Sequence, residues 1–314
     1  MGKGARISVV FLSVILTAAL GSSAVAQAAE TSRVQQANII LGVLEDLPGE
    51  YSGESDFRAV RAIFRKIGDG WQAFPTKTQS YLDLKTLPIS YPKEMTWTIA
   101  FDGRNLGRIT SQTLSHFNFY SEIGIEQITS HSQIPTVGKK SLDYGGFSHT
   151  PVYRPLVAVS QPNFFDPEQW KPAHLSPILV AAARKQFRNQ FPKVSNCKNP
   201  EENVLRPWKY QDEDIHETRA YSSKNGWSLI ELNLTGNACD GFQGQDAYFG
   251  QWYVIDPLGK VKYLGTNMWL VDAGDYDNSG KSALLFSIDG YNAGGYRLFY
   301  QDFTQSAEFS FHFH

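Results

Sequence analysis

The residues best suited to chemistry lie near the C-terminus, in the stretch DYDNSGKSA that begins at Asp275. Side-chain oxygens stand at alternate positions on Asp275, Asp277 and Ser279, and Gly280 follows them. Hard cations such as Ca²⁺ need six to eight oxygen ligands, and loops supply these at alternate positions with a glycine at the sharp turn. The backbone carbonyl of Lys281 would be the next ligand. These residues are therefore a candidate Ca²⁺ site.

The stretches that follow the loop, ALLFSI and GGYRLFY, are typical of two paired strands. Loop and strands together resemble the FG-GAP or VCBS-type repeats, in which a D-x-D-x-D-G-x-x-D loop joins two strands of a propeller blade and often binds calcium. The resemblance covers under a tenth of the 314 residues. It implies that Asp275, Asp277 and Ser279 hold the first, third and fifth ligand positions and that Gly280 is the turn glycine. Ala283 stands where the family has its closing acid.

The ligand count limits how tightly this loop could hold a metal. Two carboxylates and one hydroxyl leave much of the coordination shell to water, so binding is expected in the millimolar range of weak extracellular modules. Asp272 or Asp289 could complete the shell from outside the motif. The alternative is a tight turn whose Asp and Asn side chains accept hydrogen bonds from their own backbone. The sequence leaves both open, and it predicts no other cofactor.

Other chemically capable residues lack the spacing of known catalytic or metal motifs. Ser148 and His149 are neighbours, with Asp143 nearby, but adjacent side chains on an extended chain point apart and no G-x-S-x-G occurs. Four acids could supply a glycosidase pair or simply form a solvated loop: Asp212, Glu213, Asp214 and Glu217. The histidines outside the C-terminal HFH lack zinc-site spacing: His116, His131, His174 and His216. His312 and His314 alternate at the C-terminus. We predict no catalytic residue.

The N-terminus has the three parts of a signal peptide. Lys3 and Arg6 form a positive region, residues 7–20 are largely apolar, and Ala26 and Ala28 give an A-x-A cleavage pattern. The apolar run is shorter than the roughly 20 residues that span a bilayer. We therefore expect residues 1–28 to be removed and the mature chain to be periplasmic or secreted.

The remaining chain, residues 29–314, is long enough for one domain with a sizeable core. The formal net charge is −2, and it becomes −4 once Lys3 and Arg6 are lost. Without a basic surplus, binding to nucleic acid or to an anionic membrane by charge alone is not expected. No later segment is apolar enough to predict a membrane span.

Two cysteines, Cys197 and Cys239, lie in polar, turn-like surroundings. In an oxidising compartment, two such cysteines predict one disulfide. It would close a loop of about 40 residues and contribute about 3–4 kcal/mol in the chain-entropy model. A catalytic thiol is the alternative, but neither cysteine has a neighbouring helix or basic cluster to lower its pKa.

Two short helices are predicted. Residues 31–47 place apolar side chains on one side after a Thr-Ser cap. In the second helix, Ser176 is the predicted cap, Pro177 suits the first turn, and Pro192 ends the helix.

Nearly everything else is predicted to be strand and turn. Four tight turns separate apolar stretches, as hairpins require: Gly68–Gly70, Asp102–Gly103, Asn225–Gly226 and Asp256–Gly259. A Trp follows Gly at Gly70-Trp71 and Gly226-Trp227, and one residue later at Gly250-Gln251-Trp252, which is a loose internal echo. We therefore predict a mostly β, antiparallel fold that is propeller-like or, alternatively, a β-sandwich. Long loops are expected at about 112–152 and 194–216.

These features favour an exported, non-enzymatic binding or interaction protein of a bacterial-type envelope, with a glycan or another envelope protein as partner. One alternative is an extracytoplasmic hydrolase of a polysaccharide or peptide, and another is a structural accessory of the envelope. A hydrolase should show a concave pocket that holds two or more acids with perturbed pKa values. A binding module should instead show a shallow face rich in aromatic side chains.

Overall fold

The structure is a computed structural model. It describes residues 39–46, 57–74, 94–113, 126–130, 154–196, 206–236, 238–239, 248–290 and 293–312. In these ranges the chain is mostly β, as predicted, and the strand pairs are antiparallel. The predicted signal peptide lies outside the described residues.

The strands form four sheets. The seven-stranded sheet contains, in spatial order, β1 (Ile40–Asp46), β7 (Leu156–Val159), β4 (Glu94–Phe101), β5 (Arg104–Thr113), β6 (Glu126–Ser130), β2 (Phe57–Ile67) and β3 (Gly70–Ala73). It curls far enough that β1 also pairs with β2. The four-stranded sheet is a simple meander of β16 (Met268–Gly274), β17 (Ala283–Gly290), β18 (Ala293–Tyr300) and β19 (Gln305–His312).

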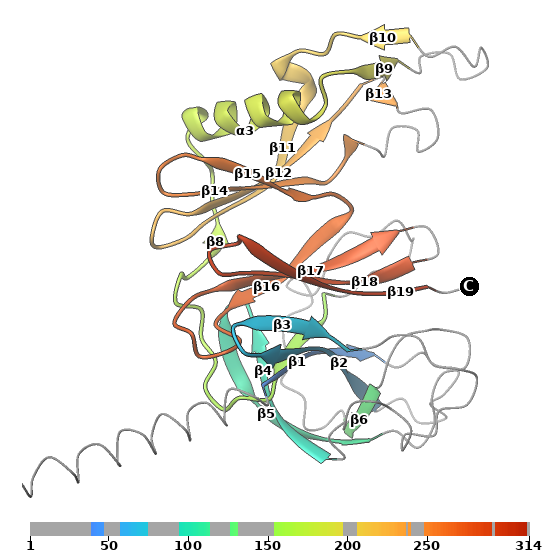
Figure 1. Ribbon diagram of the computed structural model, residues 1–314, viewed down its shortest axis with the longest axis vertical. Helices are drawn as coiled ribbons and strands as arrows, with labels where there is room; N and C mark the ends of the chain where they lie inside the picture. The colour runs from blue at the N-terminus through green and yellow to red at the C-terminus, as the bar shows by residue number, and fades with distance from the viewer. Residues whose placement is uncertain are drawn as a thin grey trace, which may run out of the picture.

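The other two sheets lie at the far end of the molecule (Figure 1). The five-stranded sheet contains β15 (Val261–Gly265), β14 (Gln251–Ile255), β12 (Ser228–Leu234), β11 (Ile215–Ser222) and β8 (Lys171–Pro172). The small three-stranded sheet contains β10 (Arg206–Trp208), β9 (Val194–Asn196) and β13 (Ala238–Cys239). Two helical segments accompany these sheets, the α-helix α3 (Pro177–Gln190) and the 3₁₀ turn η3 (Asp212–Asp214).

The main sheets stack as layers along the long axis of the molecule, with the four-stranded sheet in the middle (Figure 1). Its central strand β17 shows why. Ala283 and Leu285 belong to the core shared with the seven-stranded sheet, whereas Leu284 and Phe286 belong to the core shared with the five-stranded sheet. A strand buried on both faces is apolar at every position rather than at every second one, which is the pattern of ALLF.

The predicted hairpins are confirmed. β2 and β3 join at Gly68–Asp69, β4 and β5 at Asp102–Gly103, and β17 pairs with β18. β11–β12 and β14–β15 form the two remaining hairpins. The second predicted helix is also confirmed, because α3 begins at Pro177 after the cap Ser176.

The first predicted helix is wrong where the structure describes it, because residues 40–46 form the strand β1. The apolar run there is short and nearly continuous, a pattern that suits a buried strand as well as one side of a helix. Leu41, Val43 and Leu44 are fully buried, the first two in the core shared with the four-stranded sheet and the third in a core formed within the curled seven-stranded sheet. Gly42 lets β2 approach, since a Cβ at that position would lie 2.6 Å from the Arg61 carbonyl oxygen.

The segment 160–170 ties the three large sheets together. Asp166 N–H donates to the Gly103 carbonyl at 3.0 Å, and Asp275 N–H donates to the Phe165 carbonyl at 2.9 Å. The Glu168 carbonyl accepts from Lys224 N–H at 2.6 Å. The described parts of the two predicted long loops contain short strands, namely β6 in the first and β9 and β10 in the second.

Candidate functional site

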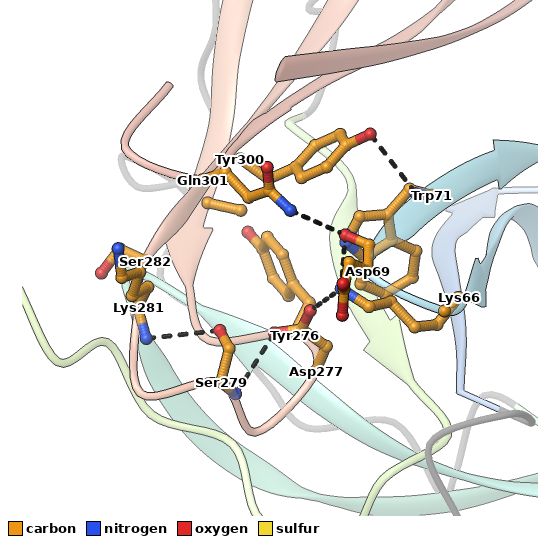
Figure 2. A pocket seen from close by; sticks show the side chains of 12 residues that line it. Lys66, Asp69, Trp71, Tyr276, Asp277, Ser279, Lys281, Ser282, Tyr300 and Gln301 are labelled. Atoms are coloured by element: carbon orange, nitrogen blue, oxygen red, sulfur yellow. Dashed lines mark hydrogen bonds and ion pairs between the residues drawn. The ribbon is translucent and has the colours of Figure 1, made fainter. Parts of the chain in front are cut away.

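A pocket of about 140 Å³ lies where the loop 275–282 meets the β2–β3 turn (Figure 2). The end of β18 and the residue after it close its third side. The lining residues are Lys66, Gly68, Asp69, Trp71, Tyr276, Asp277, Ser279, Lys281, Ser282, Ala283, Tyr300 and Gln301. The pocket therefore lies between the seven-stranded and four-stranded sheets, and the loop singled out in the sequence forms one wall.

Asp275 organises this loop from inside. Its Oδ1 accepts from the backbone N–H of Ser279 at 3.0 Å and of Asp277 at 3.2 Å, and its Oδ2 accepts from Gly280 N–H at 2.7 Å. Gly280 has φ +76°, a conformation that glycine adopts without steric cost. One carboxylate thus satisfies three backbone donors of the turn, which is the self-bonded arrangement named above as the alternative to a metal site.

Asp277 faces the other way, across the junction between the sheets. Its Oδ2 pairs with the ammonium of Lys66 on β2, and its Oδ1 accepts from Ser279 N–H at 3.3 Å (Figure 2). Lys66 Nζ also lies 5.4 Å from the ring centroid of Trp71 and donates to the Asp69 carbonyl at 3.4 Å. The positive charge next to the loop is therefore supplied by a side chain 211 residues away.

The surroundings shift the pKa values of the two acids of the loop in opposite directions. Burial raises the pKa of Asp275, and the hydrogen bonds from Gly280, Ser279 and Asp277 only partly offset this. Burial would also raise the pKa of Asp277, but the hydrogen bond and charge of Lys66, together with the hydrogen bonds of Ser279 and Asp275, outweigh it and lower that pKa. Asp277 is thus held as a carboxylate.

The remaining pocket walls are aromatic and polar. Tyr276 stacks on Phe164 with ring centroids 5.5 Å apart, and its hydroxyl is buried without a hydrogen-bond partner among the described residues. Tyr300 Oη accepts from Trp71 N–H at 3.4 Å, and Gln301 Nε2 donates to the Asp69 carbonyl at 3.0 Å. The pocket combines ring faces with several hydrogen-bonding groups.

A second group of buried acids lies next to the pocket, where the Asp102–Gly103 turn meets β16. Asp272 Oδ1 accepts from Gly103 N–H at 2.9 Å, but Oδ2 has no partner within the described part of the chain. Burial raises the pKa of Asp272 to about 7, against the opposing effects of the Gly103 hydrogen bond and Arg154. Burial also raises the pKa of Asp166, whose carboxylate accepts from Ser282 and from Trp170 N–H.

The predicted Ca²⁺ ligands do lie around one turn. However, Ser279 and Lys281 are exposed, and Lys281 pairs with Asp302 at 2.6 Å. Within the described ranges no three His, Cys, Asp or Glu side chains form a group suited to a metal ion. Ca²⁺ binding stays a prediction.

The other candidates are not brought to the pocket. Asp212 pairs with Arg188 of α3, and Asp214 Oδ2 accepts from Gln211 N–H at 2.6 Å, so these acids fasten η3. His174 and His216 are exposed. Five candidates lie outside the described residues: His116, His131, Asp143, Ser148 and His149. The side chain of His312 and all of His314 are likewise not described.

The predicted disulfide is not tested, because Cys197 lies outside the described residues. Cys239 lies in β13, where it pairs with Ser195 of β9. The disulfide stays a prediction.

Sequence reasoning missed Lys66, Trp71 and Tyr276. Lys66 and Trp71 flank a predicted hairpin turn, and Tyr276 was passed over because only the oxygen-bearing residues on either side of it fit a metal motif. No local pattern links Lys66 to the loop. A Lys that faces the buried side of a strand among Ile and Phe residues was the one available signal, since buried lysines are paired.

Comparison with family models, curated proteins and solved structures found no match for the chain. Function therefore has to be inferred from the pocket itself. Among the described residues no helix is long and apolar enough to cross a membrane.

Proposed function

We propose that the chain is an exported binding protein of a bacterial-type envelope, without catalysis of its own. It recognises one sugar ring of a glycan in the pocket beside the loop 275–282, which we call the acidic loop. The observation that carries this proposal is the pocket lining, in which Trp71, Tyr276 and Tyr300 stand among carboxylate, ammonium, hydroxyl and amide groups. Aromatic faces with nearby hydrogen-bonding groups suit sugar rings, which are apolar on their faces and polar at their edges.

Pocket size supports a small ligand. The pocket has a volume of about 140 Å³. Drug-sized ligands occupy pockets of roughly 300–1,000 Å³. A single ring or a terminal group fits this space better than an extended polymer does.

The electrostatics favour binding over hydrolysis. A glycosidase needs one carboxyl group that is protonated near neutral pH and a second carboxylate at a set distance. Asp277, the lining acid with a lowered pKa, is paired with Lys66 and so is a poor proton donor. Asp272, the acid with a pKa of about 7, is fully buried and is not among the lining residues.

The propeller-like arrangement is part of the same proposal. Its support is the pair of meanders: β16–β19 form one four-stranded antiparallel sheet, and β11, β12, β14 and β15 are consecutive neighbours in the sheet stacked on it. Propeller blades are four-stranded sheets of this kind.

A thermal-shift screen of the mature chain against cell-wall monosaccharides tests the proposed ligand class. A sugar that binds the folded state raises the melting temperature by mass action. The same screen with Ca²⁺ and with a chelator tests the predicted metal. We expect a concentration-dependent rise with at least one sugar, and no rise with any of them would contradict the proposal.

Two glutamine variants locate the binding site. Gln301→Ala removes an exposed pocket-lining amide, and Gln305→Ala removes an exposed amide from the start of β19, outside the pocket. We expect Gln301→Ala to reduce the sugar-induced shift at least severalfold and Gln305→Ala to keep it. Equal shifts in both variants would place the sugar elsewhere.

A further inference from the structure

We infer that the Lys66 ammonium is the resident cation of the acidic loop, and that its pair with Asp277 is a positioning contact that fixes the two walls of the pocket relative to each other. Lys66 belongs to the seven-stranded sheet and Asp277 to the turn between two strands of the four-stranded sheet. The role of the pair does not depend on the proposed sugar, since it concerns how the loop is held.

Asp275 supplies the hydrogen bonds that close the loop. Asp275 accepts the N–H groups of Asp277, Ser279 and Gly280, and this bonding closes the turn. Asp275 is therefore engaged with its own loop. Asp277 is left as the carboxylate that faces outward from the turn toward β2, where the ammonium of Lys66 meets it.

The surroundings of Lys66 suit a fixed cation. The ring of Trp71 lies 5.4 Å from Nζ, and the Asp69 carbonyl accepts from it at 3.4 Å. An ammonium over an indole face is stabilised by the negative face of the ring. Lys66 thus has a carboxylate, a carbonyl and an aromatic face around one buried charge.

Lys281, which lies on the loop itself, offers a matched comparison with Lys66 on β2. The side chains of Lys66 and Asp277 are 8% and 11% exposed, whereas those of Lys281 and Asp302 are 56% and 54% exposed. Both pairs join a lysine to an aspartate and both lysines line the pocket. Water and salt screen the exposed pair but have little access to the buried one. Lys66 should therefore contribute more to the stability of the loop than Lys281 does.

A Ca²⁺ ion would have to displace Lys66 in order to use Asp277. The loop supplies few oxygens, and loops with few charged ligands bind Ca²⁺ only in the millimolar range. A tethered ammonium competes at a high effective concentration. We therefore expect the native chain to respond little to millimolar Ca²⁺.

The test compares Lys66→Met with Lys281→Met by thermal melting of the mature chain, each without added metal, with several millimolar CaCl₂, and with CaCl₂ followed by a chelator. We expect a large fall in melting temperature for Lys66→Met and almost none for Lys281→Met. We also expect Ca²⁺ to restore part of the loss in Lys66→Met, reversibly on chelation, because the freed Asp277 then lacks a cation.

Two results would overturn the inference. One is an equal, small effect of both substitutions. The other is a clear Ca²⁺-induced rise in the native chain that Lys66→Met does not increase. If Lys66→Met fails to fold, the double variant Lys66→Met, Asp277→Asn is tested instead. Removal of both charges should recover folding. A continued failure would show that the unpaired charge of Asp277 is not what prevents folding. None of these arms uses a sugar, so they are separate from the test of the ligand class.

Discussion

Two neighbouring regions of the molecule bury acids in opposite ways. In the acidic loop, Asp277 has a lysine partner and a lowered pKa. At the junction between the Asp102–Gly103 turn and β16, Asp272 has one hydrogen bond, one oxygen without a partner among the described residues, and a pKa of about 7. Both side chains are almost inaccessible to water.

Because both acids are buried, the difference between their pKa values comes from their partners. Burial disfavours a carboxylate in both places. The ammonium of Lys66, with the hydrogen bonds of Ser279 and Asp275, reverses that effect at Asp277. The backbone hydrogen bonds from Gly103 and Ala273 and the charge of Arg154 do not reverse it at Asp272. The first acid can hold two sheets together by charge, and the second is a neutral acid over much of the pH range.

The largest expected effect comes from removing the charge of Asp277. Asp277→Asn leaves the Lys66 ammonium buried without its counter-charge, and breaking a buried pair from one side costs about 3–5 kcal/mol. Urea denaturation of the variant and the native chain at pH 7 measures the free energy of unfolding. A loss below about 1 kcal/mol would show that the pair is solvated and contributes as a surface pair does.

The second prediction concerns pH and Asp272. A folded-state pKa raised from 3.8 to about 7 gives stability that is complete below pH 3.8 and lost as pH rises through 7. One pKa unit corresponds to about 1.4 kcal/mol, so the full loss is on the order of 4 kcal/mol. Asp272→Asn cannot ionise, and we expect it to match the native chain near pH 4 and to exceed it in stability near pH 8.

Denaturation of both proteins across this pH range checks the prediction. A constant difference between Asp272→Asn and the native chain would contradict it. Asp277 should behave in the opposite direction: its lowered pKa gives stability that is present above pH 3.8 and lost as pH falls further. Asp272 therefore lowers the free energy of unfolding at high pH, and protonation of Asp277 lowers it at low pH.

A smaller effect is expected at Tyr276. Its buried hydroxyl has no partner within the described ranges, and a buried polar group without one costs about 1–3 kcal/mol. Tyr276→Phe keeps the ring that stacks on Phe164, so we expect a gain on the order of 1 kcal/mol in the ligand-free protein. If a sugar uses this hydroxyl, the variant should also show a weaker sugar-induced shift. A destabilised variant would reveal a native hydrogen bond.

The smallest effect is expected for Lys281→Met. Both partners of the Lys281–Asp302 pair are more than half exposed, and such surface pairs contribute less than about 1 kcal/mol. Denaturation in low and high salt should therefore give nearly the same difference from the native chain. A loss of unfolding free energy as large as that of Asp277→Asn would contradict the claim that the buried lysine stabilises the fold more than the exposed one.

Local turn chemistry made much of this fold predictable. Asp102–Gly103 and Asn225–Gly226 lie at hairpin turns. In a third turn, the side chain of Asp256 accepts hydrogen bonds from the backbone N–H groups of Leu258 and Lys260. These signals act within a few residues, so they can be read from sequence. The helix α3 was predictable for the same reason, because its cap and its proline are local.

What the sequence did not predict depends on contacts between distant residues. The sequence predicts a helix where β1 lies, because the residues that bury its two faces lie elsewhere in the chain: in the four-stranded sheet on one side and on other strands of its own curled sheet on the other. The acidic loop was recognised as a candidate cation site, but its lysine lies 211 residues away. No local sequence pattern at Lys66 or at Asp277 predicts the other residue, so the pair becomes visible only when the sheets are stacked.

A double-mutant cycle on Lys66 and Asp277 tests the central claim most directly. The free energies of unfolding of the native chain, Lys66→Met, Asp277→Asn and the double variant give the coupling between the two side chains. We predict a coupling of at least about 2 kcal/mol, with the double variant more stable than the sum of the single losses implies. A coupling within about 0.5 kcal/mol of zero would mean that the two residues act independently, and that this ammonium does not hold the loop.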